Sequence, residues 1–370
     1  MRRRAGWVGA GLAVVLAAGL VVAWSRAGGS SWPSRLTIRP PAGSWPLGLS
    51  ADGRSYLLGG DEGATSVDLA TGGAVASPAP PRVRLRCRAA DGRHYAGVAW
   101  GDFIPDGAVV WSDARTHAVE RSFPAPNLQV RLLDLVDDGR TIRAVAGLRN
   151  NSTVVITWDI ATGAEARRPI AGPGPGFSRP LAFAPGGRAW AYLDFKRDAV
   201  QVWDGDLDRP LGPPLRTPAT RRDLASWAWA AALFLPDGRT VYVGRSDGQV
   251  EAWDRVEHRL IREVRLFPAG STVMNLILAP DGRTVAATGA VLRSPTWAGQ
   301  VRDHARWRIT GESISEATQE AVLLDLATHR VVARAPGSVP TEFTPDSRSV
   351  VTLGRDKAIS VRDLPRSGAP

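Results

Sequence analysis

The sequence of 370 residues predicts an all-β fold, a seven-bladed β-propeller of four-stranded antiparallel blades. The main observation is a phrase that recurs seven times: Asp-Gly-Arg or a close variant, then an apolar strand, then Trp-Asp or a remnant of it. A period of roughly 20–50 residues is typical of repeat architectures. The arginines that mark the units are Arg54, Arg93, Arg140, Arg188, Arg239, Arg283 and Arg348, and the aspartates that close them are Asp68, Asp113, Asp159, Asp204, Asp254, Asp325 and Asp363.

The fifth unit, residues 235–254, shows why each repeat should be a sheet. Asp237-Gly238 and Asp247-Gly248 are hairpin turn signals, because glycine tolerates the positive φ that tight turns require. The runs next to these turns are short and rich in β-branched and aromatic residues. This gives three antiparallel strands, and the stretch after Trp-Asp has room for a fourth. Four-stranded units repeated around an axis form a β-propeller.

At this point the chain, over about residues 35–370, resembles the WD40-repeat family of β-propellers. The tryptophan that gives the family its name is matched by Trp111, Trp158, Trp203 and Trp253, and the corresponding residues of the first, sixth and seventh units are Val67, Leu324 and Arg362. Residues 159–163 are similar to the family's turn after Trp-Asp. No Gly-His dipeptide occurs in the sequence, so the family's buried histidine network cannot form. We therefore expect a divergent propeller whose blades depend mostly on apolar packing.

The two ends of the repeat region predict how the ring closes. The last unit stops a few residues after Asp363, which leaves no sequence for its fourth strand. Upstream of the first unit, residues 35–40 form an isolated strand candidate. In WD40-like rings the N-terminal strand completes the last blade and so removes an exposed sheet edge. The expected domain is thus a propeller over 35–370 closed by the strand 35–40, with a linker at 27–34.

Residues 1–26 predict a membrane anchor. Three arginines follow Met1, and an uncharged apolar run extends from Ala5 to Trp24, long enough for a helix of about 30 Å. The basic flank favours a single-pass topology with residues 5–24 in the membrane, a cytoplasmic N-terminus and an extracytoplasmic propeller. The alternative is a secreted protein released by cleavage of a signal peptide near Ser25-Arg26-Ala27. The single cysteine, Cys87, excludes a lipid-modified N-terminus and internal disulfides.

The charge of the chain is a poor indicator of a nucleic-acid partner. The formal net charge is +10, and 44 of the 46 basic residues are arginines, with Lys196 and Lys357 the exceptions. These arginines are spread through the repeats rather than gathered in one segment. We therefore expect no nucleic-acid partner. We also expect the protein to be monomeric.

Unequal repeats indicate where a partner would bind. In the sixth unit 42 residues separate Arg283 from Asp325, against 14 to 20 in the other units, and the excess lies at about 289–320. The other long connection lies between Asp204 and Arg239. The resemblance places both on one rim, and Trp and Arg are enriched in binding hot spots. The candidate partner-binding residues are Arg293, Trp297, Arg302, Arg306, Trp307, Arg308, Arg221 and Arg222.

A structural interpretation of the same segments stays open. Trp227 and Trp229 could lie in the inner strand of the fifth blade and pack against its neighbours. The arginines would then be ordinary solvated surface residues in a chain whose basic residues are almost all arginines.

No motif in the sequence predicts catalysis, a cofactor or a metal site. His117, His258 and His329 each follow a closing aspartate by four positions, the place that Gly72 and Gly163 occupy in other units. This indicates a left-handed turn position, which histidine tolerates better than most residues. The remaining two, His94 and His304, have no partner at metal-ligand spacing.

The sequence thus predicts a membrane-anchored, non-enzymatic scaffold that presents a propeller rim to a protein or peptide on the outer side of the membrane. Two other classes remain open. A propeller enzyme of the lactonase or quinoprotein type would need carboxylates, histidines or a metal at the central channel. A polysaccharide-binding module would use exposed tryptophan faces for stacking on sugars.

Overall fold

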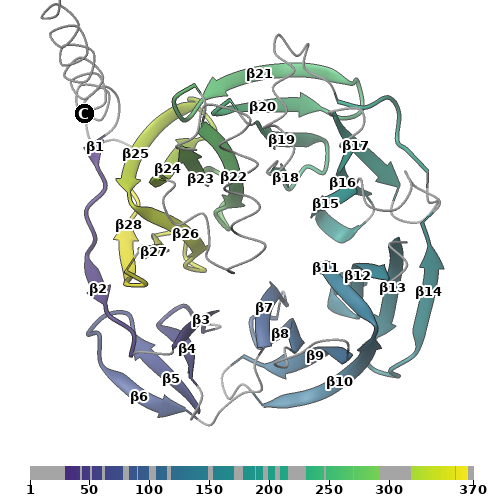
Figure 1. Cartoon of the computed structure of the whole chain (residues 1–370), viewed down its shortest axis with the longest axis horizontal. Helices are drawn as coiled ribbons and strands as arrows, with labels where there is room; N and C mark the ends of the chain where they lie inside the picture. Colours follow the sequence, from purple (N-terminus) through teal and green to yellow (C-terminus); the bar gives the residue numbers. More distant parts are fainter. Residues whose placement is uncertain are drawn as a thin grey trace, which may run out of the picture.

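The computed structural model describes residues 30–365 apart from 42–43, 51, 61–62, 78–82, 90, 100–105, 115–117, 149–152, 171–177, 188, 195–198, 205–208, 216–230, 246, 270, 292–317 and 355. It confirms the predicted all-β ring of seven antiparallel blades (Figure 1). Each blade runs from an inner strand at the centre of the ring to an outer strand at its circumference (Figure 1).

The strands are named here by blade. Blades 1 to 3 contain β3 (Trp45–Leu49), β4 (Ser55–Gly60), β5 (Gly63–Asp68) and β6 (Ala74–Ser77); β7 (Val83–Arg88), β8 (His94–Ala99), β9 (Asp106–Asp113) and β10 (Val119–Pro126); β11 (Leu128–Val136), β12 (Thr141–Leu148), β13 (Thr153–Asp159) and β14 (Glu165–Pro169). Blades 4 and 5 contain β15 (Ser178–Phe183), β16 (Ala189–Asp194) and β17 (Ala199–Asp204); β18 (Ala232–Phe234), β19 (Thr240–Gly244), β20 (Gln249–Asp254) and β21 (Arg259–Arg265). Blades 6 and 7 contain β22 (Ser271–Leu278), β23 (Thr284–Val291), β24 (Thr318–Asp325) and β25 (Arg330–Pro336); β26 (Ser338–Phe343), β27 (Ser349–Gly354), β28 (Ile359–Asp363) and β2 (Leu36–Ile38).

Isolated bridges in blade 4 and two short turns complete the described elements. Blade 4 has three described strands, and Leu215 and Pro210 form isolated bridges to the outer strand β17. Two 3₁₀ turns, η1 (Asp137–Gly139) and η2 (Pro185–Gly187), connect the first two strands of blades 3 and 4.

The closing aspartates fold the turn between the third and fourth strands. In blade 1, Asp68 Oδ1 accepts hydrogen bonds from the backbone N–H and the hydroxyl of Thr71, at 2.7 and 2.8 Å. Asp159 and Asp325 are capped in the same way by a threonine three residues later. Such side-chain bonds to nearby backbone are what favours aspartate in turns.

The left-handed turn position is as the sequence predicts where it is described. Gly72 and Gly163 have φ of 76° and 79°, and His258 and His329 have φ of 51° and 53°. His117 lies outside the described residues. These two histidines are therefore explained by backbone conformation, since histidine is among the residues that enter this region most easily.

Apolar side chains fill the spaces between neighbouring blades. One cluster joins blades 2 and 3 through Phe123, Ile142 and Trp158, and another joins blades 5 and 6 through Phe267, Val285 and Leu324. The remaining large clusters lie between blades 3 and 4, 4 and 5, 6 and 7, and 7 and 1. The expectation that apolar packing holds the blades together agrees with this arrangement.

The register corrects the assignment of Trp111. In blade 5 the pairing of β19 with β20 places Val241 opposite Trp253, and in blade 2 the pairing of β8 with β9 places the equivalent residue, Tyr95, opposite Ser112. Ser112 therefore occupies the family's tryptophan position in blade 2. Trp111 lies one residue earlier and, because side chains alternate along a strand, projects from the other face of the sheet.

The N-terminal segment closes the ring at blade 7. Strand β2 pairs antiparallel with β28, so that the purple start and the yellow end of the chain lie side by side (Figure 1). Arg35 Nε donates to Asp363 Oδ1 at 3.1 Å, and Ser349 Oγ donates to the same oxygen at 2.8 Å. This pairing covers the edge of β28 and gives blade 7 its fourth strand.

The packed structure begins upstream of the expected linker boundary. Residues Ser30–Ser31 form strand β1, which pairs in parallel with β25 of blade 6, and Trp32 is only 4% exposed. Trp32 Nε1 donates to Asp363 O at 2.9 Å, and the Arg362 guanidinium lies 6.0 Å from the Trp32 ring centre and donates to Trp32 O. Part of the segment 27–34 therefore bridges blades 6 and 7. A short polar segment carries no periodic pattern, which is why it resembled a linker.

Membrane crossing is not visible in the described part of the chain. No helix there is long and apolar enough to span a bilayer. The predicted anchor, residues 5–24, lies outside the described residues.

Replacement of Trp32 by alanine should destabilise the ring. The change removes a buried indole and leaves a cavity between blades 6 and 7, which typically costs about 3–5 kcal/mol. Urea unfolding followed by fluorescence measures the free energy of unfolding. Val75→Ala, at a side chain in blade 1 that is 69% exposed, is the control and should change it by less than about 0.5 kcal/mol. Equal effects of the two substitutions would show that Trp32 does not stabilise the contact between blades 6 and 7.

Candidate functional site

The predicted partner-binding residues all lie outside the described part of the chain. They are Arg221 and Arg222 in the segment 216–230, and Arg293, Trp297, Arg302, Arg306, Trp307 and Arg308 in the segment 292–317. What the structure does show is where these two segments are attached to the blades.

The longer segment is attached to blade 6 at the end of a regular hairpin. Val291 of β23 pairs with Thr318 of β24, and the ladder continues without interruption through Gly289 and Glu320. Gly289 and Glu320 therefore belong to the strands, and the connection is shorter than the predicted 289–320.

The second segment ends at the same rim of the neighbouring blade. Ala231, which follows segment 216–230, accepts a hydrogen bond from Gly244 N at 2.8 Å. The next residue of blade 5, Arg245, accepts one from Val273 N of blade 6 at 2.9 Å. Val273 in turn pairs with Gly289, two residues before the end of β23. The attachment points of the two segments are thus joined by a short chain of direct backbone contacts, and we call this region the loop rim.

Ion pairs around a buried carboxylate lie at the loop rim in blade 5. The carboxylate of Glu251 is 3% exposed and accepts hydrogen bonds from Arg245 Nη1 and from Trp253 Nε1, the latter at 2.8 Å. Arg245 Nη2 also lies 3.2 Å from Asp247 Oδ2, in the hairpin turn. A buried carboxylate that lost this arginine would remain desolvated without a partner, which makes the pair important for the local structure.

A second ion pair lies within blade 6, and its arginine also contacts blade 5. Arg334 Nη1 lies 3.1 Å from Glu320 Oε2 in blade 6, and both side chains are largely buried. Arg334 Nη2 donates to Leu266 O at the end of blade 5, at 2.9 Å. Burial raises the pKa of Glu320, although the Arg334 charge and hydrogen bond act in the opposite direction. The loop rim therefore has a rigid base made of charged side chains that already have partners.

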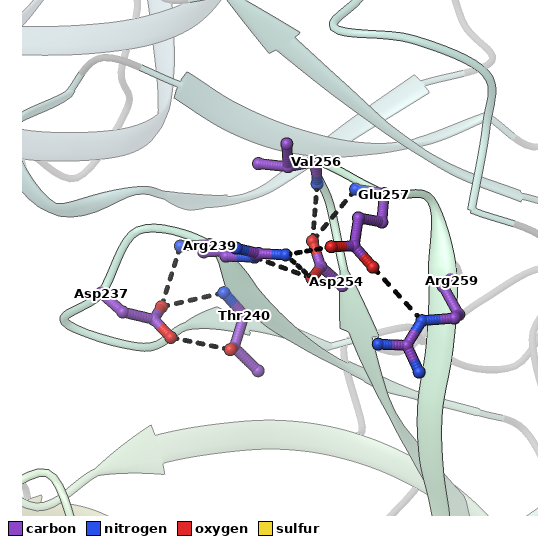
Figure 2. A network of polar contacts seen from close by, with 7 residues as sticks. All are labelled: Asp237, Arg239, Thr240, Asp254, Val256, Glu257 and Arg259. Carbon is purple, nitrogen blue, oxygen red and sulfur yellow. Dashed lines mark hydrogen bonds and ion pairs between the residues drawn. The ribbon is translucent and has the colours of Figure 1, made fainter.

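The opposite rim carries the Asp-Gly-Arg turns, since these lie at the other end of the same strands. Figure 2 shows its best-developed network, in blade 5. Asp237 accepts hydrogen bonds from Arg239 N, Thr240 N and the Thr240 hydroxyl, each at 2.8 Å. Arg239 then reaches across to the closing residue Asp254 and to Glu257. The network joins the two turns of the blade and has a structural role.

The arginine controls the ionisation of the closing aspartate. The hydrogen bond from Arg239 holds the pKa of Asp254 at about 2, although desolvation acts in the opposite direction, and the backbone N–H groups of Glu257 and Val256 support the arginine. A depressed pKa in the folded state means that the carboxylate stabilises the fold at neutral pH.

His94 has acidic partners in the structure. His94 Nδ1 lies 2.6 Å from Asp91 Oδ2, and its Nε2 lies 3.4 Å from Glu120 Oε2. One ligand atom from each of His94, Asp113 and Glu120 can be chosen so that all lie within 4.8 Å of one another. The imidazole stacks on Trp111, with ring centres 4.9 Å apart and an angle of 18° between planes. This is a set of residue types that could hold a metal ion.

The charges around His94 are acidic. Partial burial acts to lower the pKa of His94, but the hydrogen bond from its ring to Asp91 and the charges of Asp91, Glu120 and Asp113 outweigh it and raise the pKa. Spacing along the sequence indicates no metal-ligand partner for His94, but the structure brings Asp113 and Glu120 close to it. Its partners lie on two other strands at separations of 19 and 26 residues, which no local spacing rule covers.

Carboxylates on the inner strands bear on the enzyme alternative. Burial raises the pKa of Asp134 on β11 to about 6, with Leu135 N and the charge of Arg143 acting against it. Glu342 on β26 accepts a hydrogen bond from Leu49 N at 3.1 Å. These two carboxylates belong to blades 3 and 7, which are not neighbours in the ring (Figure 1), and both contact backbone amides. They do not form a pair for acid–base catalysis.

Comparisons with known proteins support the fold alone. No protein-family model and no curated protein matches the sequence. In contrast, 1461 chains of solved structures resemble the fold, and such a common architecture does not identify a function. One of them belongs to the crystal structure of the mitotic checkpoint complex, with a TM-score of 0.59 and 15% identity, covering 92% of this chain and 97% of that one.

Arg245→Ala should destabilise the protein by about 3 kcal/mol, because it leaves the Glu251 carboxylate buried without its cation. Urea unfolding measures the change. Arg259→Ala is the control, since that side chain is 65% exposed, and it should cost less than about 0.5 kcal/mol. Adding Glu251→Gln to Arg245→Ala should recover part of the loss. A double variant less stable than Arg245→Ala would contradict the assigned charge pair.

Arg239→Met should lower the melting temperature at neutral pH, and the difference from wild type should shrink as the pH falls. The sign follows from the depressed pKa of Asp254: its stabilisation is complete above the ordinary pKa of 3.8 and is lost as pH falls through the folded value of about 2. Thermal melts from pH 7 to pH 2 test this. Arg283→Met is the control at the equivalent position of blade 6, where Thr328 caps Asp325. A pH-independent difference for Arg239→Met would exclude an effect through Asp254.

Proposed function

We propose that this protein is a membrane-tethered, non-enzymatic scaffold that binds a protein or peptide through the loop rim of blades 5 and 6. The observation that carries the proposal is the common attachment of the two longest connections. Segments 216–230 and 292–317 join the ring at adjacent blades and on the same rim. Together they supply six arginines and two tryptophans of the candidate binding set.

A rigid base under variable connections suits a recognition surface. Binding residues are found disproportionately on loops that a stable scaffold positions. Here the base is held by Glu251 with Arg245 and by Glu320 with Arg334, all partly or fully buried. Tryptophan and arginine are the residue types most enriched in hot spots, and an arginine-rich surface suits an acidic partner. The mitotic checkpoint complex, to which the similar chain belongs, is a protein assembly, which is consistent with a propeller used for protein contacts.

The same proposal places the propeller close to the membrane. The apolar run ends at Trp24, and the folded ring begins at Ser30. Six residue steps span at most roughly 20 Å when fully extended. An anchored N-terminus would therefore hold the seam of blades 6 and 7 near the outer membrane surface. Blade 6 belongs both to that seam and to the loop rim.

Crosslinking in intact membranes tests the proposal. The full chain, carrying a photoreactive crosslinker, should capture a specific protein partner. Replacement of residues 292–317 by a two-residue hairpin turn, or the pair Arg221→Glu and Arg222→Glu, should each reduce capture at least 10-fold. Arg348→Glu, at a side chain on the opposite rim that is 86% exposed, is the matched charge-reversal control and should leave capture unchanged.

Two outcomes would overturn this function. Capture that is unchanged in both rim variants would show that the partner binds elsewhere on the ring. If the purified chain bound polysaccharides and captured no protein, the partner would be a glycan and not a protein. N-terminal sequencing of the mature protein tests the anchor separately, because a cleaved signal peptide would remove residues 5–24.

A further inference from the structure

Blade 2 differs from the other blades at three positions, and all three meet at one point. Each blade repeats the same strands, so the equivalent positions of the other blades show what the fold alone requires. Residues that differ from those of every sibling blade and that converge in space indicate a local function.

The first departure is at the start of the second strand. His94 lies directly opposite the closing Asp113, and the residues opposite the other closing aspartates are Ser55, Thr141, Ala189, Thr240, Thr284 and Ser349. In blade 5 the Thr240 hydroxyl donates to Oδ2 of the turn residue Asp237 (Figure 2). In blade 2 the ring nitrogen Nδ1 of His94 takes over this contact, with Oδ2 of Asp91. The imidazole thus keeps the contact with the turn aspartate through Nδ1, and its other nitrogen, Nε2, lies near Glu120.

The second departure is on the outer strand. Glu120 is the extra residue of a β-bulge between Val119 and Arg121, and Ile261 and Val332 are the extra residues of the matching bulges in blades 5 and 6. A bulge changes the direction of a side chain relative to the regular ladder. Seven positions after the closing aspartate, blades 1, 3, 4, 5 and 6 have apolar residues: Val75, Ala166, Leu211, Ile261 and Val332. Blade 2 alone has a carboxylate there.

The third departure is Trp111. It lies two residues before Asp113, where the other blades have Ser66, Thr157, Val202, Ala252, Leu323 and Val361. Residues two apart on a strand share a face, so Trp111 and Asp113 lie on the side of the sheet where His94 lies. The nearly parallel stacking of the two rings fixes the plane of the imidazole.

We propose that His94, Asp113 and Glu120 bind a divalent transition-metal ion of the zinc class. An ion with metal–ligand distances of about 2.0–2.2 Å holds neighbouring ligand atoms about 3.3–3.5 Å apart in tetrahedral geometry. His94 Nε2 and Glu120 Oε2 are 3.4 Å apart, and the three ligand atoms lie within 4.8 Å of one another. Three protein ligands leave one position for water or for a donor from a partner.

Asp91 supplies the outer contact that such sites usually have. A carboxylate accepts hydrogen bonds, so Nδ1 of His94 donates to Asp91, and Nε2, 3.4 Å from Glu120 Oε2, is the ring nitrogen left to bind the ion. Histidine ligands commonly donate their other ring nitrogen to a carboxylate, which sets the tautomer and the ring orientation. The imidazole also decides the class of ion, since it favours zinc and similar metals over the oxygen-seeking magnesium and calcium.

A bound ion would join three strands of one blade. His94 belongs to β8, Asp113 to β9 and Glu120 to β10, the outermost strand. It would also balance the negative charge of Asp91, Asp113 and Glu120 around a single imidazole. Binding to the folded state alone raises its stability, so the ion should raise the melting temperature as well as bind.

Titration of the full chain with Zn²⁺ alone tests the inference. The protein should carry no histidine tag and should first be freed of metal with a chelator. Wild type should bind one Zn²⁺ per chain with a rise in melting temperature. His94→Ser and Glu120→Val, which place residues of the sibling blades at these positions, should each weaken binding at least 10-fold and abolish the thermal shift. Asp91→Asn should weaken binding about 10- to 100-fold.

Matched controls separate this site from other causes. His329→Gly, which introduces the residue that blades 1 and 3 carry at that turn, should bind Zn²⁺ like wild type. The metal-free melting temperatures of His94→Ser and Glu120→Val should equal that of wild type, so that a loss of binding is not a loss of folding. The inference is wrong if wild type shows no saturable binding, or if both variants retain its affinity. Ca²⁺ binding that is equal in wild type and His94→Ser, with no preference for Zn²⁺, would also overturn it.

Discussion

Closure of the ring by the N-terminal segment is the interaction on which the rest of the structure depends. Among the described residues, apolar clusters join blade 7 to both blade 6 and blade 1, so an open ring would expose apolar surface at this point. Strand β2 supplies the missing fourth strand of blade 7, and Trp32 fills the space beside Asp363 and Arg362. The same few residues also connect the folded ring to the N-terminal apolar run. The segment that closes the ring is therefore also the one that leads to this apolar run.

Within the closed ring, function is free to develop at positions that the repeat does not need. The closing aspartates and the glycine or histidine four residues later are required by the turns themselves. The loop rim and the blade 2 cluster are different in kind. At the loop rim, extra residues are inserted between regular strands above a base of paired charges. In blade 2 single side chains at His94, Trp111 and Glu120 differ at positions that the repeat already has.

The accuracy of the sequence predictions depends on the range of the interactions concerned. The seven blades and the left-handed turns at His258 and His329 follow from local patterns, because turn and strand preferences act over a few residues. Trp111 was assigned to the wrong position, because the register across a sheet depends on the partner strand rather than on the dipeptide. The sequence predicts a linker at Trp32, because the contacts of this residue lie more than 300 residues away. The partners of His94 were missed for a related reason, since Glu120 is directed towards it by a bulge.

The sequence by itself determined the number of blades, the turn chemistry and the places where repeats are interrupted, because these are written as periodic spacing and residue type. Only the tertiary structure decided which of those residues meet. It joined the attachment points of two segments far apart in the chain at one rim, through Gly244, Arg245 and Val273. It also placed an imidazole and two carboxylates from three strands within a few ångströms. The physical reason is that strand register and ring closure, which set these distances, arise from packing between blades and not from any one repeat.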